Sequence, residues 1–245
     1  DLLSSGLLLK NSLLNFGGKA VSILAALVGI PLIISFIGTD RFGVLSIAWI
    51  ILGYMGVLDL GVGRALTKYL SEHINNKSLK KSGHLIGSAI VISLGIGLIL
   101  MVILIGLAPY VIKHILNVDT SLQAESIHAI QILAVSLFFN ILAIDFRAIL
   151  ESFQKFKILS FVQSVSSSFA YLGLASVAYF TTSLPILTLY LTFIKVGICV
   201  VLGYSVFQIL KTNKISVEFN LNHVKTLFKY GSWITISNII SPLMG

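Results

Sequence analysis

Long apolar blocks, separated by short polar segments, dominate the sequence. The blocks cover residues 20–38, 42–63, 85–112, 127–150, 158–180 and 184–210, and a further block begins near residue 228. A helix needs roughly 20 mostly apolar residues to cross the ~30 Å hydrocarbon core of a bilayer. The strict alternation of polar and apolar residues that marks transmembrane β-strands is missing from the sequence. The pattern therefore predicts an all-α integral membrane protein, a bundle of six membrane-spanning helices with the start of a seventh.

Composition supports this class and excludes a soluble enzyme. Hydrophobic residues make up 56% of the chain and charged residues 11%, whereas soluble domains carry about 25% charged residues. The single cysteine, Cys199, cannot form an intramolecular disulfide, and the five histidines lack metal-ligand spacing. The net charge of +8 could suggest nucleic acid as a partner. Because the cations lie between apolar blocks, we expect contact with anionic membrane lipids instead, and no nucleic acid.

The distribution of lysine and arginine predicts the orientation of the chain, since positive loops stay in the cytoplasm. With the amino terminus inside, only Arg41 and Lys113 fall outside, and Lys195 lies within a span. The other fourteen cations are then cytoplasmic: Lys10, Lys19, Arg64, Lys68, Lys77, Lys80, Lys81, Arg147, Lys155, Lys157, Lys211, Lys214, Lys225 and Lys229. We therefore predict a cytoplasmic amino terminus.

The order of the blocks predicts one large lobe and the beginning of another. Residues 1–220 would form an amino-terminal six-helix transmembrane lobe, and residues 221–245 would open a second lobe. The chain begins with Asp1, and its last apolar block reaches residue 245 before it could span a bilayer. We therefore expect the chain to be an amino-terminal part of a longer protein. Because the predicted loops are short, its function should lie within the membrane or at its two faces.

Lys195 is the most deeply placed charge, near the middle of the sixth block. An ammonium group at the bilayer centre costs about 2.5–3.5 kcal/mol on insertion scales. Three interpretations fit this position. Lys195 could bind an anionic headgroup in a water-filled cavity, pair with an acid of a neighbouring helix, or extend its aliphatic chain so that the ammonium group reaches toward an interface. Lys19, at the start of the first block, is a second binding candidate or else an interfacial anchor.

The remaining candidate charges lie near the predicted cytoplasmic ends of the second and fourth blocks. Asp59 precedes Arg64 by five residues, and the two could close a cytoplasmic mouth, or Asp59 could cap the span. Asp145 and Arg147 are further candidates for substrate contact. Arg147 and Glu151 are four residues apart and share a helix face, so they could form a gate or a structural ion pair.

Gly29 and Pro31 lie within the first block. A glycine and a residue without an amide donor permit a helix to kink, so these residues could act as a hinge during transport. Static packing of the first helix is the alternative.

Three segments resemble one family of membrane proteins. Residues 53–69 (GYMGVLDLGVGRALTKY) resemble the second-helix signature of Wzx-type polysaccharide biosynthesis proteins, which are flippases. Residues 10–12 with 36–43 (FIGTDRFG), and residues 146–156 (FRAILESFQKF), are also similar to that family. The similarity extends over the whole chain.

This resemblance implies membership of the multidrug/oligosaccharidyl-lipid/polysaccharide superfamily, whose MATE-like fold places two helical lobes around a central cavity. It implies a transporter in the bacterial cytoplasmic (inner) membrane, and not an enzyme. The implied function is to move an undecaprenyl-pyrophosphate-linked oligosaccharide to the outer leaflet for O-antigen, capsule or related lipopolysaccharide polymers, by alternating access. The implied partners are this lipid-linked oligosaccharide, membrane lipids, a polysaccharide polymerase and chain-length machinery. No resident cofactor is expected, and coupling to protons or sodium ions stays open.

Two related transporters, one enzyme class and a purely structural membrane scaffold are the alternatives, and the cost of burying Lys195 disfavours the scaffold. A cation-coupled drug or metabolite exporter would need an acidic site deep in the first lobe, whereas the acids here lie near block ends. A flippase for lipid-linked peptidoglycan precursors fits the same features. A membrane-embedded glycosyltransferase or polymerase is disfavoured, because such enzymes usually carry a large extracytoplasmic loop.

Overall fold

The computed structural model describes residues 5–53, 59–116 and 118–240, and all regular secondary structure within them is helical. The elements are α1 (Ser5–Gly53), α3 (Val62–Asn75), α4 (Leu79–Tyr110), η1 (Val111–Ile115), α5 (Thr120–Ser152), α6 (Phe156–Ser168), η2 (Phe169–Gly173), α7 (Leu174–Phe180), α8 (Leu184–Thr212) and α9 (Leu221–Ile240). The segments η1 and η2 are single π-helical turns, η1 continuing α4 and η2 joining α6 to α7.

Five stretches of the described chain are long and apolar enough to cross a membrane. They are Lys19–Ile47, Leu79–Ile115, Thr120–Ser152, Phe156–Phe180 and Leu184–Thr212. Many of their large apolar side chains are exposed, among them Leu27, Leu98, Phe180 and Phe193. Lipid can cover such side chains, whereas water would penalise them. The all-α integral membrane class predicted from the sequence is confirmed.

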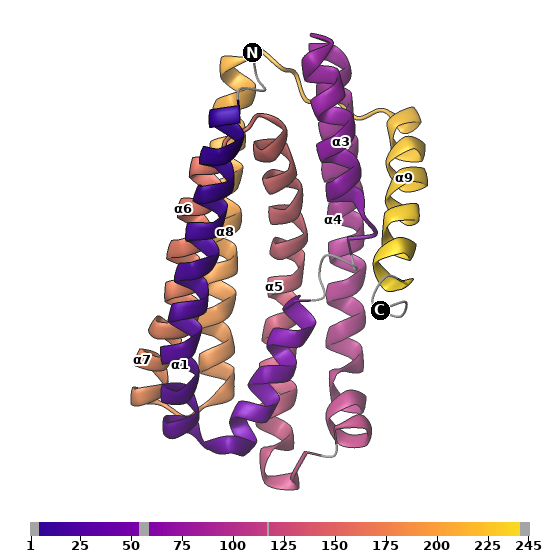
Figure 1. Cartoon of the computed structure of the whole chain (residues 1–245). Coiled ribbons are helices and arrows are strands. Elements are labelled where there is room, and N and C mark those ends of the chain that lie inside the picture. The colour runs from indigo at the N-terminus through magenta and orange to yellow at the C-terminus, as the bar shows by residue number, and fades with distance from the viewer. Residues whose placement is uncertain (1–4, 54–58, 117, 241–245) are drawn as a thin grey trace. The chain divides into compact units, whose positions relative to one another are not determined.

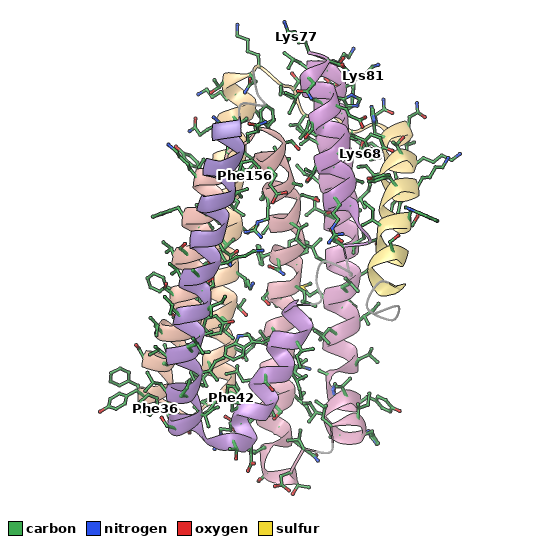
Figure 2. The ribbon with its side chains drawn as sticks, viewed as in Figure 1. Phe36, Phe42, Lys68, Lys77, Lys81 and Phe156 are labelled. Atoms are coloured by element: carbon green, nitrogen blue, oxygen red, sulfur yellow. The ribbon has the colours of Figure 1, made fainter. Side chains whose placement is uncertain are left out.

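The first stretch contains a sharp bend at Gly38. This residue has φ 81° and ψ 167°, which glycine adopts readily and other residues do not. Figure 1 shows α1 reversing direction at this bend, and in Figure 2 Phe36 and Phe42 lie close to it. The helix continues through Pro31, so Gly38 is the one non-helical residue inside α1. The bend coincides with the polar turn predicted after the first block.

The predicted second span, residues 42–63, is only partly described, because residues 54–58 lie outside the described residues. Its first part continues α1 as far as Gly53, and a turn at residues 59–61 leads into α3. Much of the basic run that follows the second block forms α3 itself. Val62, Leu66 and Leu70 of α3 are buried at a spacing of four residues, while Arg64 and Lys68 are exposed.

The chain divides into two compact units, and α1, α4, α5 and α8 contribute to both. Unit 1 comprises residues 1–48, 106–133 and 155–198, and unit 2 comprises residues 49–105, 134–154 and 199–245. The predicted lobe boundary near residue 220 stays a prediction. Each unit collects segments that are distant in the sequence, which periodicity along a single chain does not predict.

In unit 1, α1 packs parallel to the path formed by α6, η2 and α7. The Ser22 hydroxyl donates a 2.7 Å hydrogen bond to the Ser167 hydroxyl, and the rings of Phe36 and Tyr179 pack edge to face at 5.4 Å. Between these contacts, a Cβ atom on Gly29 would lie 2.8 Å from Tyr171 Cβ. Gly29 therefore permits a close approach of the two helices. A parallel alignment is the direction expected for the first and fifth of six alternating spans.

In unit 2, α3 packs against α9, as Figure 1 shows. Gly61 has φ 70°, and a side chain there would collide with the backbone of Gly231. On α4, Gly83 and Gly87 allow the segment that leads into α9 to lie directly on the helix, where side chains would collide with the carbonyl groups of Ser216 and Glu218. The Ser88 hydroxyl secures this segment by accepting from the Asn220 amide at 3.1 Å.

Candidate functional site

Asp59 caps the amino terminus of α3. Its Oδ1 accepts a 2.8 Å hydrogen bond from the Gly61 amide, and its Oδ2 accepts one of 3.2 Å from the Gly63 amide. Only 4% of Asp59 is exposed. The first amides of a helix lack intrahelical acceptors and carry partial positive charge, so a carboxylate is a favourable cap. This cap belongs to α3, and the two roles predicted for Asp59, at a cytoplasmic mouth and at the end of the second span, stay predictions.

A second buried carboxyl group lies close to this cap. Asp145 on α5 is 1% exposed and receives a hydrogen bond from Ser93 on α4, and the charge of Asp59 acts on it. Its Oδ2 atom is buried and has no hydrogen-bond partner within the part of the chain that the structure describes. Gly63 makes room for this approach, because an added Cβ would lie 2.5 Å from Ile144 on α5. Unit 2 thus brings two candidate acids together.

Arg64, Arg147 and Glu151 belong to the same unit. The positive charge of Arg64 acts favourably on Asp59, and that of Arg147 acts favourably on Glu151. Both arginines are exposed, whereas Glu151 is partly buried. Arg147 and Glu151 therefore interact along one face of α5, as their spacing predicts.

The other candidate residues lie in unit 1. Lys195 is half-buried on α8, and Lys19 is exposed near the start of the first apolar block. Gly29 is buried against Tyr171, while Pro31 is exposed within continuous helix. The geometry at Gly29 is one of close packing, and a hinge at these positions stays a prediction.

Sequence reasoning missed Glu125, which joins three helices of unit 1. Its Oε2 lies 3.4 Å from Nη2 of Arg41, and its Oε1 accepts a 2.7 Å hydrogen bond from the Leu184 amide, the first residue of α8. The side chains of Arg41 and Glu125 are 33% and 22% exposed. The distribution of lysine and arginine places Arg41 on the predicted outer face. No spacing along the chain links residues 41, 125 and 184, so only the tertiary structure shows this contact.

The sequence reasoning also missed a basic pocket in unit 2. It has a volume of about 580 Å³ and lies where α4 begins and α9 begins. The pocket is lined by Lys77, Ser78, Leu79, Lys80, Lys81, His84, Asn220 and His223. In Figure 2, Lys77 and Lys81 lie together at the end of the α3–α4 hairpin, with Lys68 farther along α3. The run from Lys77 to His84 was a visible signal, but the pairing with His223 was not.

Aromatic rings and histidines hold α3, α4 and α9 together beside this pocket. The His223 ring stacks on His84 and meets His73 edge to face, each at 6.2 Å between ring centroids. The Lys68 ammonium lies 4.1 Å from the ring centroid of Tyr230, within the range of a cation–π interaction. Among the described residues, no group of three or more His, Cys, Asp or Glu side chains could hold a metal ion.

Comparison with known proteins identifies the family. The family model described as polysaccharide biosynthesis protein matches residues 8–245. The chain belongs to this family. The matched region contains residues 53–69 and 146–156, the segments whose sequences resemble this family. The buried cap at Asp59 lies within the first of these segments.

A relative of this polysaccharide biosynthesis protein is a curated protein of Shigella flexneri named "Putative O-antigen transporter". The two are 29% identical over 241 residues, which cover 97% of this chain and 56% of the relative. The chain thus spans little more than half the length of that relative. No solved structure gave a significant match.

Proposed function

We propose that this polysaccharide biosynthesis protein forms part of a flippase that moves a lipid-linked oligosaccharide across the bacterial cytoplasmic membrane. The family match over residues 8–245 carries the proposal, and the similarity to the O-antigen transporter of Shigella flexneri supports it. The substrate would be an undecaprenyl-pyrophosphate-linked oligosaccharide for O-antigen or capsule. A polysaccharide polymerase and chain-length machinery are the expected partners.

Physical chemistry makes such a carrier necessary. Sugars and a pyrophosphate group cannot enter hydrocarbon without a large desolvation cost, while a polyprenyl tail can stay in lipid throughout. A protein therefore has to shelter only the headgroup, and alternating access of two lobes would expose it first to one face and then to the other. The similarity to the O-antigen transporter of Shigella flexneri favours a transporter over a glycosyltransferase or polymerase.

Lys195 is the residue that we propose to contact the anionic headgroup. It is half-buried in the middle of α8, a helix with a membrane-spanning stretch at Leu184–Thr212. A charge kept at this depth implies either a polar partner or an aqueous cavity. Arg64, Arg147 and Lys19 would serve as loading contacts near the predicted cytoplasmic face.

The test replaces Lys195 in the protein and follows surface polysaccharide in cells. We expect Lys195→Ala to abolish polymer export and to leave lipid-linked oligosaccharide on the cytoplasmic side, at an unchanged level of protein in the membrane. Lys195→Arg, which keeps the charge, should retain partial export. Lys113→Ala removes an exposed lysine elsewhere and is the matched control. Normal export by Lys195→Ala would remove Lys195 from the site.

A cation-coupled exporter is the second candidate, and the burial of Asp145 favours it. Although Asp145 lies near the end of α5, it is 1% exposed and its Oδ2 has no partner among the described residues. Such a carboxyl group could bind a proton or a sodium ion, which would also serve to couple a flippase. Asp145→Asn should then uncouple transport from the ion gradient. Export of drugs or metabolites, in place of polymer display, would decide for the exporter.

A further inference from the structure

The basic pocket of unit 2 has the features of an anion site that the transport proposal does not use. Its volume of about 580 Å³ lies in the range of ~300–1,000 Å³ typical of small-ligand sites. Three lysines line it, and all three are exposed, so their ammonium groups remain available to a ligand. The pocket lies at the amino terminus of α4, where the first amides of a long helix add to the positive potential.

The second wall of the pocket is held in place by short contacts. The Ser88 hydroxyl bonds both the amide and the carbonyl group of Asn220, at 3.1 and 2.9 Å. The Glu218 amide donates to the Gly83 carbonyl at 3.4 Å. These contacts fix the start of α9 on α4, so the histidine of α9 faces the lysines of α4 in a preformed site.

Two histidines line the pocket beside the lysines, one from α4 and one from α9. His84 Nε2 lies 3.6 Å from a Glu218 carboxylate oxygen. Burial and the nearby charges of His73, His84 and Lys81 hold the pKa of His223 below its usual value. The charge of Lys81 acts on the His223 ring, and both side chains line the pocket.

We propose that the pocket formed by Lys77, Lys80, Lys81, His84 and His223 binds a phosphate group at the membrane surface. Phosphate suits the site because it is a compact, multiply charged anion that accepts several hydrogen bonds from ammonium groups and helix amides. The source is either a phospholipid headgroup or a free phosphate or pyrophosphate ion. The membrane-spanning stretch Leu79–Ile115 starts at this pocket, which places it at headgroup level.

The test uses the full chain, purified in detergent, and the double variant Lys80→Gln/Lys81→Gln. In one arm, inorganic pyrophosphate is titrated by calorimetry. In the other, the protein is placed in nanodiscs of phosphatidylcholine with or without phosphatidylglycerol, and retained lipid is counted by native mass spectrometry. We expect the double variant to weaken binding about 25-fold in at least one arm, because each lysine near an anionic surface contributes a factor of about five. Weaker binding of pyrophosphate by the double variant identifies a free ion as the ligand. A loss of retained lipid alone, with pyrophosphate binding unchanged, identifies a phospholipid headgroup.

The matched control is Lys225→Gln/Lys229→Gln, which removes the same charge from α9. These residues follow His223 by two and six positions, which at about 100° per residue places them roughly on the opposite side of the helix. This control should bind like the wild type. Equal loss in both double variants would show diffuse attraction, and no loss in either would show that the pocket is not used. Both results would overturn the proposal, whatever the outcome for Lys195.

Protonation gives a second readout. Phosphate should bind more tightly as the pH falls from 7 to 5, because the lowered pKa of His223 lets the ring gain charge only toward the acid end of this range, and His223→Gln should reduce this change. The comparison with the variant cancels the titration of pyrophosphate itself. An identical pH dependence in both proteins would remove His223 from the site.

Discussion

The carboxylate of Asp59 lies 2.8 Å from the amide of Gly61 and supplies the cap from which α3 starts. Asp59→Ala would leave two amides without this acceptor, and we expect a loss of about 1–2 kcal/mol in the free energy of unfolding. Asp59→Asn keeps an oxygen that can accept from one amide and should lose less. Thermal unfolding of the purified protein in detergent measures both. Equal stability of Asp59→Ala and the wild type would contradict the capping role.

Gly61 should tolerate no side chain. Its φ of 70° costs a residue with a Cβ atom about 1 kcal/mol or more, and the added atom would collide with the backbone of Gly231. We expect Gly61→Ala to lower the free energy of unfolding by about 2 kcal/mol or more, since strain and overpacking add. Gly95→Ala is the control, because an added Cβ there meets nothing within 4 Å. It should be neutral or slightly stabilising.

Glu125 should contribute more through the Leu184 amide than through Arg41. Glu125→Ala removes both contacts and should cost about 1–2 kcal/mol. Glu125→Gln keeps an acceptor for the amide and loses only the ion pair, for which about 0.5 kcal/mol is expected at this exposure. A double-mutant cycle with Arg41→Ala isolates the ion pair. If the coupling energy accounts for the whole effect of Glu125→Ala, the ion pair with Arg41 contributes more than the hydrogen bond from the Leu184 amide, and the prediction is wrong.

We expect the free energy of unfolding to fall in mild acid because of two histidines. Burial lowers the pKa of both His73 and His223. The unfolded chain therefore binds protons more readily than the folded one, so stability is complete above about pH 6.5 and declines as the pH falls toward the folded-state values. We expect the melting temperature of His223→Gln to depend less on pH between 7.5 and 5.5 than that of the wild type.

Several charged groups face His223 and bear on this result. They are His73 from α3, with Glu72 acting on that ring, and Lys81 and His84 from α4, with Glu218 beside His84. Carboxylates elsewhere titrate in both proteins, so the difference between the two melting curves reports the histidine. Parallel curves would show that His223 has the same pKa in the folded and unfolded states.

Much of the membrane character could be predicted from the sequence, because a helix that crosses the bilayer needs an apolar block long enough to match its thickness. The bend at Gly38 lies at the short polar segment between the first two predicted blocks, and the ends of α6, α7 and α8 lie close to the predicted blocks. The start of α9 was placed too late, near residue 228 in place of Leu221, because its first turns are polar and basic. The helical state of the run after residue 61 was likewise not expected, since an amphipathic surface helix lacks a continuous apolar block.

By itself, the sequence determined the class of protein, its family and the residues that carry charge in or near the membrane, because these depend on composition and local order. The tertiary structure decided what those charges do. Asp59 became a cap, Asp145 became buried beside Ser93, and Glu125 met Arg41 and the first amide of α8. Burial and hydrogen bonding depend on which distant segments pack together. Small residues such as Gly61, Gly83 and Gly87 allow that packing, because a backbone from elsewhere in the chain lies against each of them. The pattern of residues along the sequence does not show which segment that is.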